Sequence, residues 1–402
     1  MQKLGSKALV KRMNRAAVLN AVRERGQIGR AEIADLTHIS RASVTYIVAE
    51  LLEEGWLIEQ EKGQTTPSGG RPPILLQFNP DSVYAVVVML GSERTAVSLG
   101  NADAAALYTH SVPARPEAGA AETVEIVSAL IERALKESRV DRERVRGVVI
   151  GVPGLVDSLN SVVHYSARLP GLRNVDLGAQ VQARVKLPVA VENETRLIGW
   201  GEQKFGHGQG RSPLVCVNIT LGIGSCVILE DRMLFGSSYS AGQFGHMTVD
   251  ADGSLCECGN RGCWETLASN AALLERARRA GAPWSENPSV EGILEASARG
   301  DARARALLRE TATHIGVGIA NIINIVNPEV IVLHGKVFGA GEELLRGVRH
   351  VVADRALKLP ALNAQIVISD LGERAGLAGG VSLVVRRTLE APLVRRENDL
   401  YL

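Results

Sequence analysis

The sequence has few cysteines, almost no net charge and no long apolar run. Its 402 residues carry a formal net charge of +1, which argues neither for nor against a nucleic-acid partner. There is no apolar N-terminal segment and no run near the length of a membrane span, so we expect a cytoplasmic protein without a membrane partner. With 46% hydrophobic and 22% charged residues, the chain is typical of a globular protein with two or three domains.

Three of the five cysteines lie in one loop-like stretch, residues 241–265, together with a histidine. In a reducing compartment, clustered cysteines are more typical of metal ligands than of disulfides. Glycine, aspartate and asparagine let this stretch turn tightly, so that His246, Cys256, Cys258 and Cys263 can converge on one tetrahedral Zn²⁺. Four protein ligands leave no position for a catalytic water, so we expect a structural zinc. The alternative is a set of unconnected buried thiols.

The charge is unevenly distributed. Residues 1–30 contain eight basic residues against the single acidic Glu24, a charge of +7. A basic segment on a near-neutral body is typical of a surface that binds the phosphates of nucleic acid.

The same segment has the pattern of a helix-turn-helix. We predict a helix over 12–25 that stops at Gly26, a short helix over 29–36, and a third helix after the N-cap residue Ser40. The front of the third helix is polar and suits hydrogen bonding to base edges and phosphates in a major groove. The DNA-binding candidates here are Arg30, Ser40, Arg41, Ser43, Thr45 and Tyr46. The alternative is a small helical domain that binds proteins.

A wing is expected to follow the third helix. Strands over 56–60 and 74–79 flank a loop in which Gly69 to Pro73 is extended and presents Arg71. Such a segment suits a narrow minor groove, where the negative potential is highest. The equally weighted alternative is a mobile linker whose arginine touches only phosphates.

From residue 83 the pattern changes to apolar strands and amphipathic helices. Strands are predicted over 84–90, 94–99, 105–112, 145–154 and 187–194, with a helix over 124–137 and another from Thr195. Residues 212–229 repeat the paired strands of 83–99, and a helix over 316–327 precedes a strand over 328–335. Two such units predict two α/β lobes with a ligand-binding cleft between them.

We therefore expect a DNA-binding domain over 1–80, a first lobe over 81–194 to which a C-terminal helix over 375–394 returns, and a second lobe over 195–374 that carries the zinc loop 241–265.

The motifs G-V-P-G (151–154) and G-H…C-E-C-G-N-R-G-C-W-E (245–265), with the N-terminal head, resemble the ROK family of repressors and sugar kinases. The head is similar to that of its winged-helix repressor branch, which responds to xylose, glucose or N-acetylglucosamine. The resemblance implies a sugar-kinase/actin-like (ribonuclease H-like) body, zinc on the four ligands above, and a sugar in the cleft. Position by position, the sugar contacts fall on Gly154, Asn193, Glu194, Gln243, His246 and Glu265.

The positions that depart from the family's kinase motifs are as informative about activity as the positions that match the family. The first phosphate loop, D-x-G-G-T in the kinases, is here Met89-Leu90-Gly91-Ser92-Glu93, and the second is Thr220-Leu221-Gly222-Ile223-Gly224-Ser225-Cys226. Side chains in these loops obstruct a backbone cradle for phosphate. Glu194 stands where the catalytic base is Asp, and its extra methylene displaces the carboxylate. Together these changes argue against ATP-dependent phosphorylation.

The sequence thus predicts a transcriptional regulator, a repressor of carbohydrate-utilisation genes. We expect a homodimer or homotetramer that binds a double-stranded DNA operator and responds to a sugar effector. Two alternatives remain: a sugar kinase with a DNA-binding appendage, and a repressor that a protein partner releases from DNA.

Overall fold

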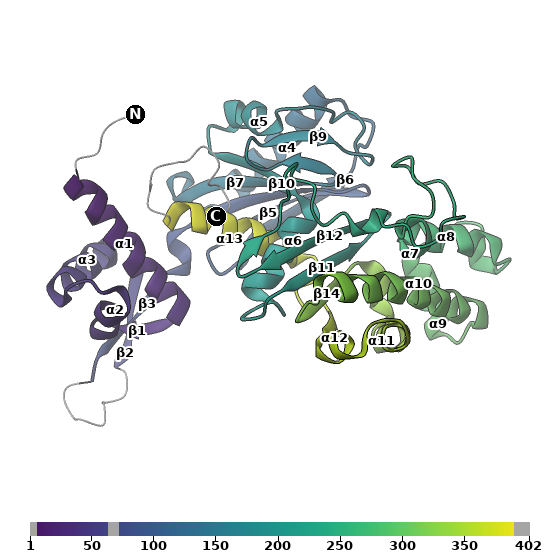
Figure 1. The fold of residues 1–402 in the computed structure, drawn as a ribbon. Helices are drawn as coiled ribbons and strands as arrows, with labels where there is room; N and C mark the ends of the chain where they lie inside the picture. Colours follow the sequence, from purple (N-terminus) through teal and green to yellow (C-terminus); the bar gives the residue numbers. More distant parts are fainter. Residues whose placement is uncertain (1–5, 63–71, 390–402) are drawn as a thin grey trace.

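A computed structural model describes residues 6–62 and 72–389 and shows a small head beside a larger two-lobed body (Figure 1). The greater part of the predicted wing loop, Arg71 included, lies outside the described residues. Within the described part, no helix is long and apolar enough to cross a membrane.

The head has the predicted winged helix-turn-helix fold. Its elements are α1 (Ser6–Arg25), β1 (Gln27–Gly29), α2 (Arg30–Thr37), α3 (Arg41–Glu53), β2 (Leu57–Lys62) and β3 (Ile74–Phe78). Gly26, at a φ of +77°, ends α1, and the Ser40 hydroxyl accepts a hydrogen bond from the backbone N–H of Ser43 as the N-cap of α3. Sequence reasoning missed β1, which pairs with β3 in a three-stranded sheet, because three residues are too few for a strand pattern.

Two five-stranded sheets form the body. The first contains β4 (Tyr84–Leu90), β5 (Arg94–Asn101), β6 (Ala106–Pro113), β7 (Val145–Val152) and β10 (Val189–Asn193). The second contains β11 (Leu214–Ile219), β12 (Ile223–Leu229), β13 (Arg232–Met233), β14 (Val330–His334) and β15 (Gln365–Ile368). Their orders, β10-β7-β4-β5-β6 and β15-β14-β11-β12-β13, match strand for strand, with three parallel strands followed by two antiparallel ones. The repeat predicted from residues 83–99 and 212–229 is therefore a repeat of topology. We call these sheets and their helices the first and second lobes.

Helices cover both sheets. In the first lobe α4 (Ala120–Glu137) and α5 (Leu177–Val185) pack together on one face. A short hairpin of β8 (Leu155–Asp157) and β9 (Val162–Tyr165) precedes α5 in the chain. The helices α7 (Glu265–Ala268), α8 (Asn270–Arg279), α9 (Val290–Ala298), α10 (Ala302–Val326), α11 (Glu342–Arg355) and α12 (Lys358–Asn363) belong to the second lobe. The predicted helix over 316–327 is only the end of α10, whose first half buries Leu307, Leu308 and Ile315 but is otherwise rich in Arg and Ala.

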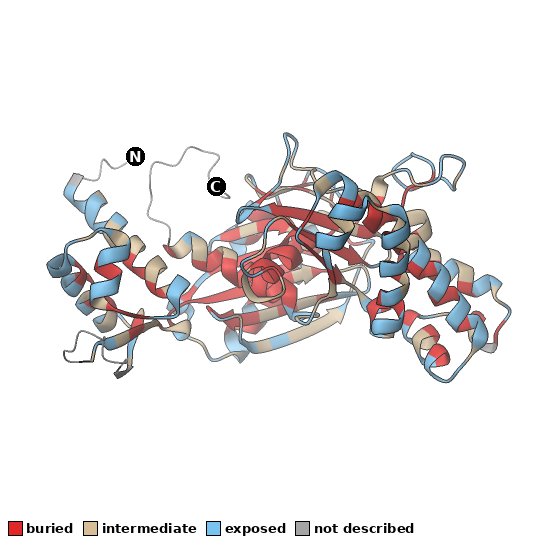
Figure 2. Cartoon of the chain, turned by 60° about the horizontal axis from the view of Figure 1, so that its bottom comes forward, coloured by how far each residue is buried: buried red, intermediate tan, exposed pale blue. Residues whose placement is uncertain are grey.

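Two helices, α6 (Glu194–Phe205) and α13 (Arg374–Leu389), lie between the two sheets. Helix α6 packs on β11 and β12 of the second lobe, whereas α13 packs on β4 and β7 of the first, as the sequence predicted for a returning C-terminal helix. The two helices cross at Gly201 and Gly379, where each glycine lies against the backbone of the other helix. Figure 2 shows this centre as buried, while the outer helices keep an exposed face.

The head is joined to the body by a shared core and a short hydrogen-bonded linker. Val18 and Val22 of α1 belong to the same apolar cluster as Val381 of α13. In the linker, Asn79 donates a side-chain hydrogen bond to the Gly55 carbonyl (2.8 Å), which follows α3. The Arg146 guanidinium of β7 lies over the Trp56 ring of the head, 5.8 Å from its centroid. These contacts fix how the head meets the first lobe.

The close crossing of α6 and α13 leads to a stability prediction. In Gly379→Ala the new methyl group collides with the Leu197 carbonyl, so the helices must separate. Overpacking of this kind costs typically about 1–3 kcal/mol, and we expect a loss of about 2–3 kcal/mol in urea unfolding. Gly119→Ala is the control, because nothing lies within 4 Å of the position that its methyl group would take, and it should cost under about 1 kcal/mol. Equal stability of the two variants would contradict this account of the crossing.

Candidate functional site

A pocket opens between the lobes, and all the sugar-contact candidates predicted from the sequence line it. The first lobe and the start of α6 contribute Gly154, Tyr165, Arg168, Asn193 and Glu194. The second lobe contributes the loop over 220–225 together with Gln243, His246, Glu257 and Glu265. Residues distant in sequence thus surround one cavity lined largely by polar side chains.

The N-terminus of α6 forms one wall of the pocket. The Asn193 side-chain oxygen accepts hydrogen bonds from the N–H groups of Thr195 and Arg196 (2.9 and 3.1 Å), so it caps the helix. Its amide nitrogen donates to the Gly154 carbonyl (2.9 Å). Gly154 has a φ of +125°, and a side chain there would collide with the Tyr165 carbonyl. Asn193 therefore shapes the wall, and its amide nitrogen has a second hydrogen available to a ligand.

Glu194 is the first residue of α6 and lines the same wall. Burial raises the pKa of Glu194 to about 7, and the nearby positive charge of Arg168 opposes the rise. The carboxyl group therefore changes between its neutral and charged forms near physiological pH. A neutral carboxyl group donates one hydrogen bond and accepts others, whereas a carboxylate only accepts.

Sequence reasoning missed Arg168, which no motif marks. It follows β9 in the first lobe, yet its guanidinium donates to the Leu221 carbonyl of the second lobe (3.1 Å). It also lies 3.4 Å from the Glu257 carboxylate in the cysteine loop. Arg168 thus joins the two lobes at the pocket, and this role depends on tertiary structure alone.

A buried ion pair behind the pocket was also missed. The carboxylate of Glu192, fully buried, lies 3.1 Å from the Arg196 guanidinium, which is 5% exposed. Arg196 also donates to the carbonyls of Val156 in the first lobe and Tyr239 in the second (both 3.1 Å). Such a pair is costly to break, because one charge would stay buried alone. It fixes the start of α6 against both lobes.

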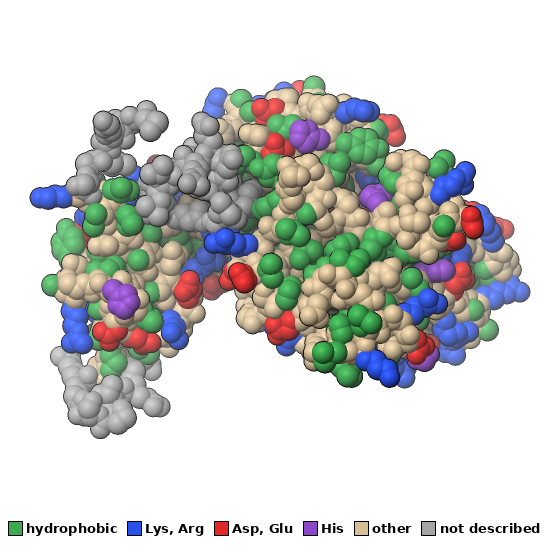
Figure 3. All heavy atoms as spheres, in the orientation of Figure 1, with side chains coloured by type: hydrophobic (Ala, Val, Ile, Leu, Met, Phe, Trp, Pro, Cys, Tyr) green, Lys and Arg blue, Asp and Glu red, His purple; other side chains and the backbone are tan. Residues whose placement is uncertain are grey.

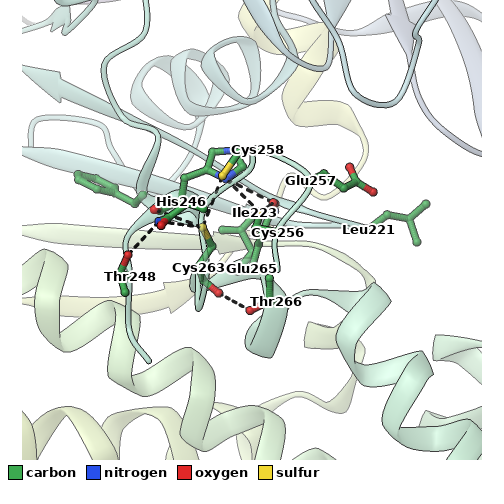
Figure 4. A network of polar contacts seen from close by, with 12 residues as sticks. Leu221, Ile223, His246, Thr248, Cys256, Glu257, Cys258, Cys263, Glu265 and Thr266 are labelled. Carbon is green, nitrogen blue, oxygen red and sulfur yellow. Dashed lines mark hydrogen bonds and ion pairs between the residues drawn. The ribbon is translucent and has the colours of Figure 1, made fainter. Parts of the chain in front are cut away.

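The four predicted metal ligands come together (Figure 4). The ligand atoms of His246, Cys256, Cys258 and Cys263 all lie within 4.8 Å of one another. The Cys258 and Cys263 sulfurs are 3.6 Å apart, and the Cys256 sulfur is 3.7 Å from His246 Nδ1. Around a tetrahedral zinc the corresponding edges measure about 3.8 and 3.5 Å. The group is therefore close enough to hold a metal ion.

The cysteine cluster and the pocket share residues. His246 and Cys258 line both, and a Glu265 carboxylate oxygen lies 3.4 Å from His246 Nδ1. The other Glu265 oxygen accepts the N–H of Ile223 (3.3 Å), within the loop that corresponds to the second phosphate loop. A change in the cluster must therefore alter the pocket wall.

Met89 and Glu93, which the sequence predicts to depart from the kinase motifs, have partners of their own. Met89, which the family resemblance places where the kinases carry an acid, packs beside Gly151 and Gly376 and joins the apolar core. The Glu93 carboxylate accepts a hydrogen bond from Lys336 Nζ (2.8 Å) in the second lobe. The same ammonium group lies 2.8 Å from Glu291 of the second lobe. The pair of Glu93 and Lys336 therefore bridges the two lobes beside the loop over 89–93.

On the head, the predicted reading face of α3 is exposed. Arg41, Ser43, Thr45 and Tyr46 are all exposed, and Tyr46 keeps 60% of its surface open. Part of the basic charge, however, is paired within the head. Lys11 bonds to Glu50 (2.7 Å), Arg15 pairs with Glu54, and Arg30 lies 2.9 Å from Glu59. Blue side chains at the edges of the head in Figure 3 mark where basic residues remain open to solvent.

Comparison with known proteins divides the chain into the same two parts as the structure, a head and a body. Residues 85–387 match the ROK family model, and residues 14–58 match the model for winged helix-turn-helix DNA-binding domains. The chain is 29% identical over 399 residues to the xylose repressor of Caldicellulosiruptor bescii, across 97% of this chain and 99% of that protein.

Solved structures include both regulators and kinases. A ROK family transcriptional regulator, a homolog of the E. coli MLC protein, superposes with a TM-score of 0.80 at 27% identity and covers 95% of this chain and 97% of its own. A Streptomyces griseus glucokinase in complex with glucose and AMPPNP superposes with a TM-score of 0.67 at 31% identity, over 75% of this chain and 98% of its own. The kinase therefore matches a portion of the chain, and the regulator nearly all of it.

The raised pKa of Glu194 predicts a pH-dependent stability. Unfolding returns this pKa from about 7 to its ordinary value of 4.5, so the folded state binds the proton more tightly. The stability that protonation supplies is full below about pH 4.5 and is lost as the pH rises to about 7. The variant Glu194→Gln keeps an uncharged side chain at every pH. Its free energy of unfolding, relative to the wild type, should therefore rise by about 2 kcal/mol from pH 5 to pH 8 in urea unfolding. Parallel stability curves for the two proteins would contradict the assignment.

Proposed function

The chain belongs to the ROK family, and from this premise we propose that it is a sugar-responsive transcriptional repressor that binds operator DNA through its winged helix. The observation that carries the proposal is a direct connection between two sites. Glu194, in the pocket, begins α6, α6 crosses α13 at backbone distance, and α13 packs in one core with α1 of the head. A full-length relative of this architecture is a named xylose repressor.

The pocket suits a ligand with several hydroxyl groups. Glu194, Gln243, Glu265 and His246 supply carboxyl, amide and imidazole groups that donate to or accept from vicinal hydroxyls. A site of this kind rejects compounds that lack a hydroxyl, because its own groups then stay unpaired. We infer that the effector is a sugar or sugar derivative, with Asn193 and Gly154 as shaping residues.

The effector acts by favouring one arrangement of the lobes. A ligand shifts an equilibrium only through different affinities for its two states. Contacts across the pocket, such as Arg168 to the Leu221 carbonyl, differ between open and closed lobes. Because α6 packs on the second lobe and α13 on the first, relative movement of the lobes displaces these helices and, through α13, the head.

We infer that the cysteine cluster binds a structural Zn²⁺ through His246, Cys256, Cys258 and Cys263. Three thiolates and an imidazole are the donor set of a closed tetrahedral zinc site, and the distances fit one. The ion would hold the loop over 241–265 so that Gln243, His246 and Glu265 face the cavity. These side chains, and no metal-bound water, would contact the effector.

DNA recognition is assigned to the front of α3, with Arg41, Ser43, Thr45 and Tyr46 reading the major groove. We also assign DNA contacts to Ser40, the N-cap of α3, to Arg30, the first residue of α2, and to Arg71 of the wing loop. We infer that the regulator acts in the cytoplasm, as a homodimer or homotetramer that reads repeated half-sites. We keep the division into 1–80, 81–194 with 375–394, and 195–374 as the proposed domains.

A sugar kinase is the second candidate, since a glucokinase shares the fold of the body. Three features of the sequence count against it: Met89 in place of the first-loop acid, the acidic Glu93 in the same loop, and Glu194 as a lengthened base. A repressor released by a protein partner is a third candidate, for which the altered Glu194 and Gln243 are the argument.

The operator assay is the first test. DNA selected from a genomic library by the full-length protein is titrated by fluorescence anisotropy, with and without xylose, glucose and N-acetylglucosamine at millimolar concentration. We expect one sugar class to weaken operator binding at least tenfold. Arg41→Ala should weaken operator binding by roughly tenfold and leave sugar binding intact, because it removes a groove contact. Arg346→Ala, an exposed arginine of α11, is the matched control.

Two results would decide against this function. Operator affinity that no sugar in a wide panel changes would remove the sensing role. Steady turnover of ATP and Mg²⁺ with a sugar would instead establish the kinase.

Metal content is the second test. The purified protein should contain one zinc per chain by mass spectrometry of metals, and Cys258→Ser should lose it. Cys258 is exposed, so its substitution removes a ligand without opening a core cavity. We expect at least tenfold weaker sugar binding, because the pocket wall loosens, and unchanged operator binding. Cys216→Ala, a thiol outside the cluster, should keep its zinc. A folded, zinc-free protein with a normal sugar response would exclude this role.

A further inference from the structure

The ammonium group of Lys336 lies between carboxylates of both lobes. Its Nζ lies 2.8 Å from Glu93, in the turn between β4 and β5 of the first lobe. It also lies 2.8 Å from Glu291, in the first turn of α9 of the second lobe. Hydrogen bonds to Glu291 and then to Glu93 raise the pKa of Lys336, so the side chain stays charged at physiological pH. We call these three residues the lysine bridge.

Both ends of the lysine bridge stand on backbone that its own lobe holds in place. The N–H of Ala114, after β6, donates to the Glu93 carbonyl (2.9 Å), which ties the turn to the edge of the first sheet. Lys336 follows Gly335, which has a φ of +131° and lies so close to the Ile219 carbonyl that a side chain would collide with it. A relative movement of the lobes must therefore lengthen or break the bond between Lys336 and Glu93.

Lys336 also separates two like charges. Because Glu93 and Glu291 each lie 2.8 Å from the same nitrogen atom, their nearest oxygens are no more than twice that distance apart. Two carboxylates at such a separation repel each other when no cation lies between them. Glu93 belongs to the first lobe and Glu291 to the second, so a neutral side chain at position 336 would push the lobes apart. The charged lysine draws them together.

We propose that Lys336 is a positioning residue, which biases the lobes toward the arrangement in which pocket residues of both lobes reach one effector molecule. Lys336 is not among the residues that line the pocket, so it acts through the distance between the lobes and does not touch the ligand. The effector's part in this proposal rests on the sugar-sensing function proposed above. A protein binds its ligand more weakly when the competent arrangement is less populated, so loss of the bridge lowers the affinity for the effector.

The test compares neutral variants of the bridge in the full-length protein. Calorimetry at low salt measures the binding of xylose, glucose and N-acetylglucosamine. Glu93→Gln removes the pair between the lobes and should weaken sugar binding about two- to fivefold, the size of an exposed ion pair. Glu291→Gln is the matched control, because it removes a carboxylate at the same 2.8 Å from the same ammonium group but within the second lobe. It should leave sugar binding unchanged.

The lysine variants give the distinctive result. Lys336→Gln should weaken sugar binding more than Glu93→Gln does, because it leaves the two carboxylates in mutual repulsion. The double variant Glu93→Gln/Lys336→Gln should bind sugar better than Lys336→Gln and as well as Glu93→Gln, because one carboxylate remains. These differences should shrink at high salt, which screens exposed charges. The three side chains are 49–60% exposed, so circular dichroism and thermal melting should match the wild type.

Small-angle X-ray scattering without sugar separates the bridge from the sensing function. At equal mass by light scattering, Lys336→Gln should have a larger radius of gyration than the wild type, and the double variant should reverse part of the increase. An unchanged radius in Lys336→Gln, or a double variant that binds sugar no better than Lys336→Gln, would overturn the proposal while the repressor function stands. Expansion of Lys336→Gln in a protein that binds no sugar would support the bias of the lobes and overturn the sensing function.

Discussion

The crossing of α6 and α13 is the contact on which the rest of the structure depends. Gly201 and Gly379 let the two helices approach until each lies against the other's backbone, a distance that no side chain would permit. One helix packs on the second sheet and the other on the first, so the crossing sets the distance between the lobes. Because α6 begins at the pocket and α13 shares a core with α1, the same contact links a ligand wall to the DNA-binding head.

Packing stabilises the helix crossing, whereas ion pairs and hydrogen bonds from charged side chains stabilise the pocket. Glu192 and Arg196 fix the start of α6 from inside, and Arg168 joins the first lobe to the Leu221 carbonyl of the second. Arg196, on α6, donates to carbonyls of both lobes, and Arg168 of the first lobe donates to a carbonyl of the second. A ligand that competes for even one of these bonds therefore changes the energy difference between lobe arrangements, which is the requirement for a sensor. The cysteine cluster adjoins the same wall, since His246 and Cys258 also line the pocket.

The sequence predicted those features that local chemistry decides. Ser40 as an N-cap, Gly26 as a helix stop and the convergence of His246 with three cysteines all follow from residue type and spacing. Apolar runs predicted most strands of both sheets. Arg168 could not be found in this way, because its partners lie more than fifty residues away. The strand β1 was too short to recognise, and the outward leucines of α12 look in sequence like any short core helix. For Arg168 and for the leucines of α12, the sequence did not predict the direction in which the side chain points, because tertiary packing decides that direction.

The charge of the head shows how far composition can mislead. The eight basic residues near the N-terminus suggest a strongly positive surface, but Lys11 and Arg15 are paired with the acidic end of α3, and Arg30 with β2. These pairs connect α1 to the end of α3, and α2 to β2 of the wing, so part of the basic charge holds the elements of the head together instead of contacting phosphate. Exposed ion pairs contribute only about 0.2–1 kcal/mol each, so DNA phosphates can still compete for these side chains. Basic side chains that already pair with carboxylates in the head release fewer counterions when they bind phosphate. The salt dependence of operator binding should then correspond to fewer phosphate contacts than the eight basic residues imply.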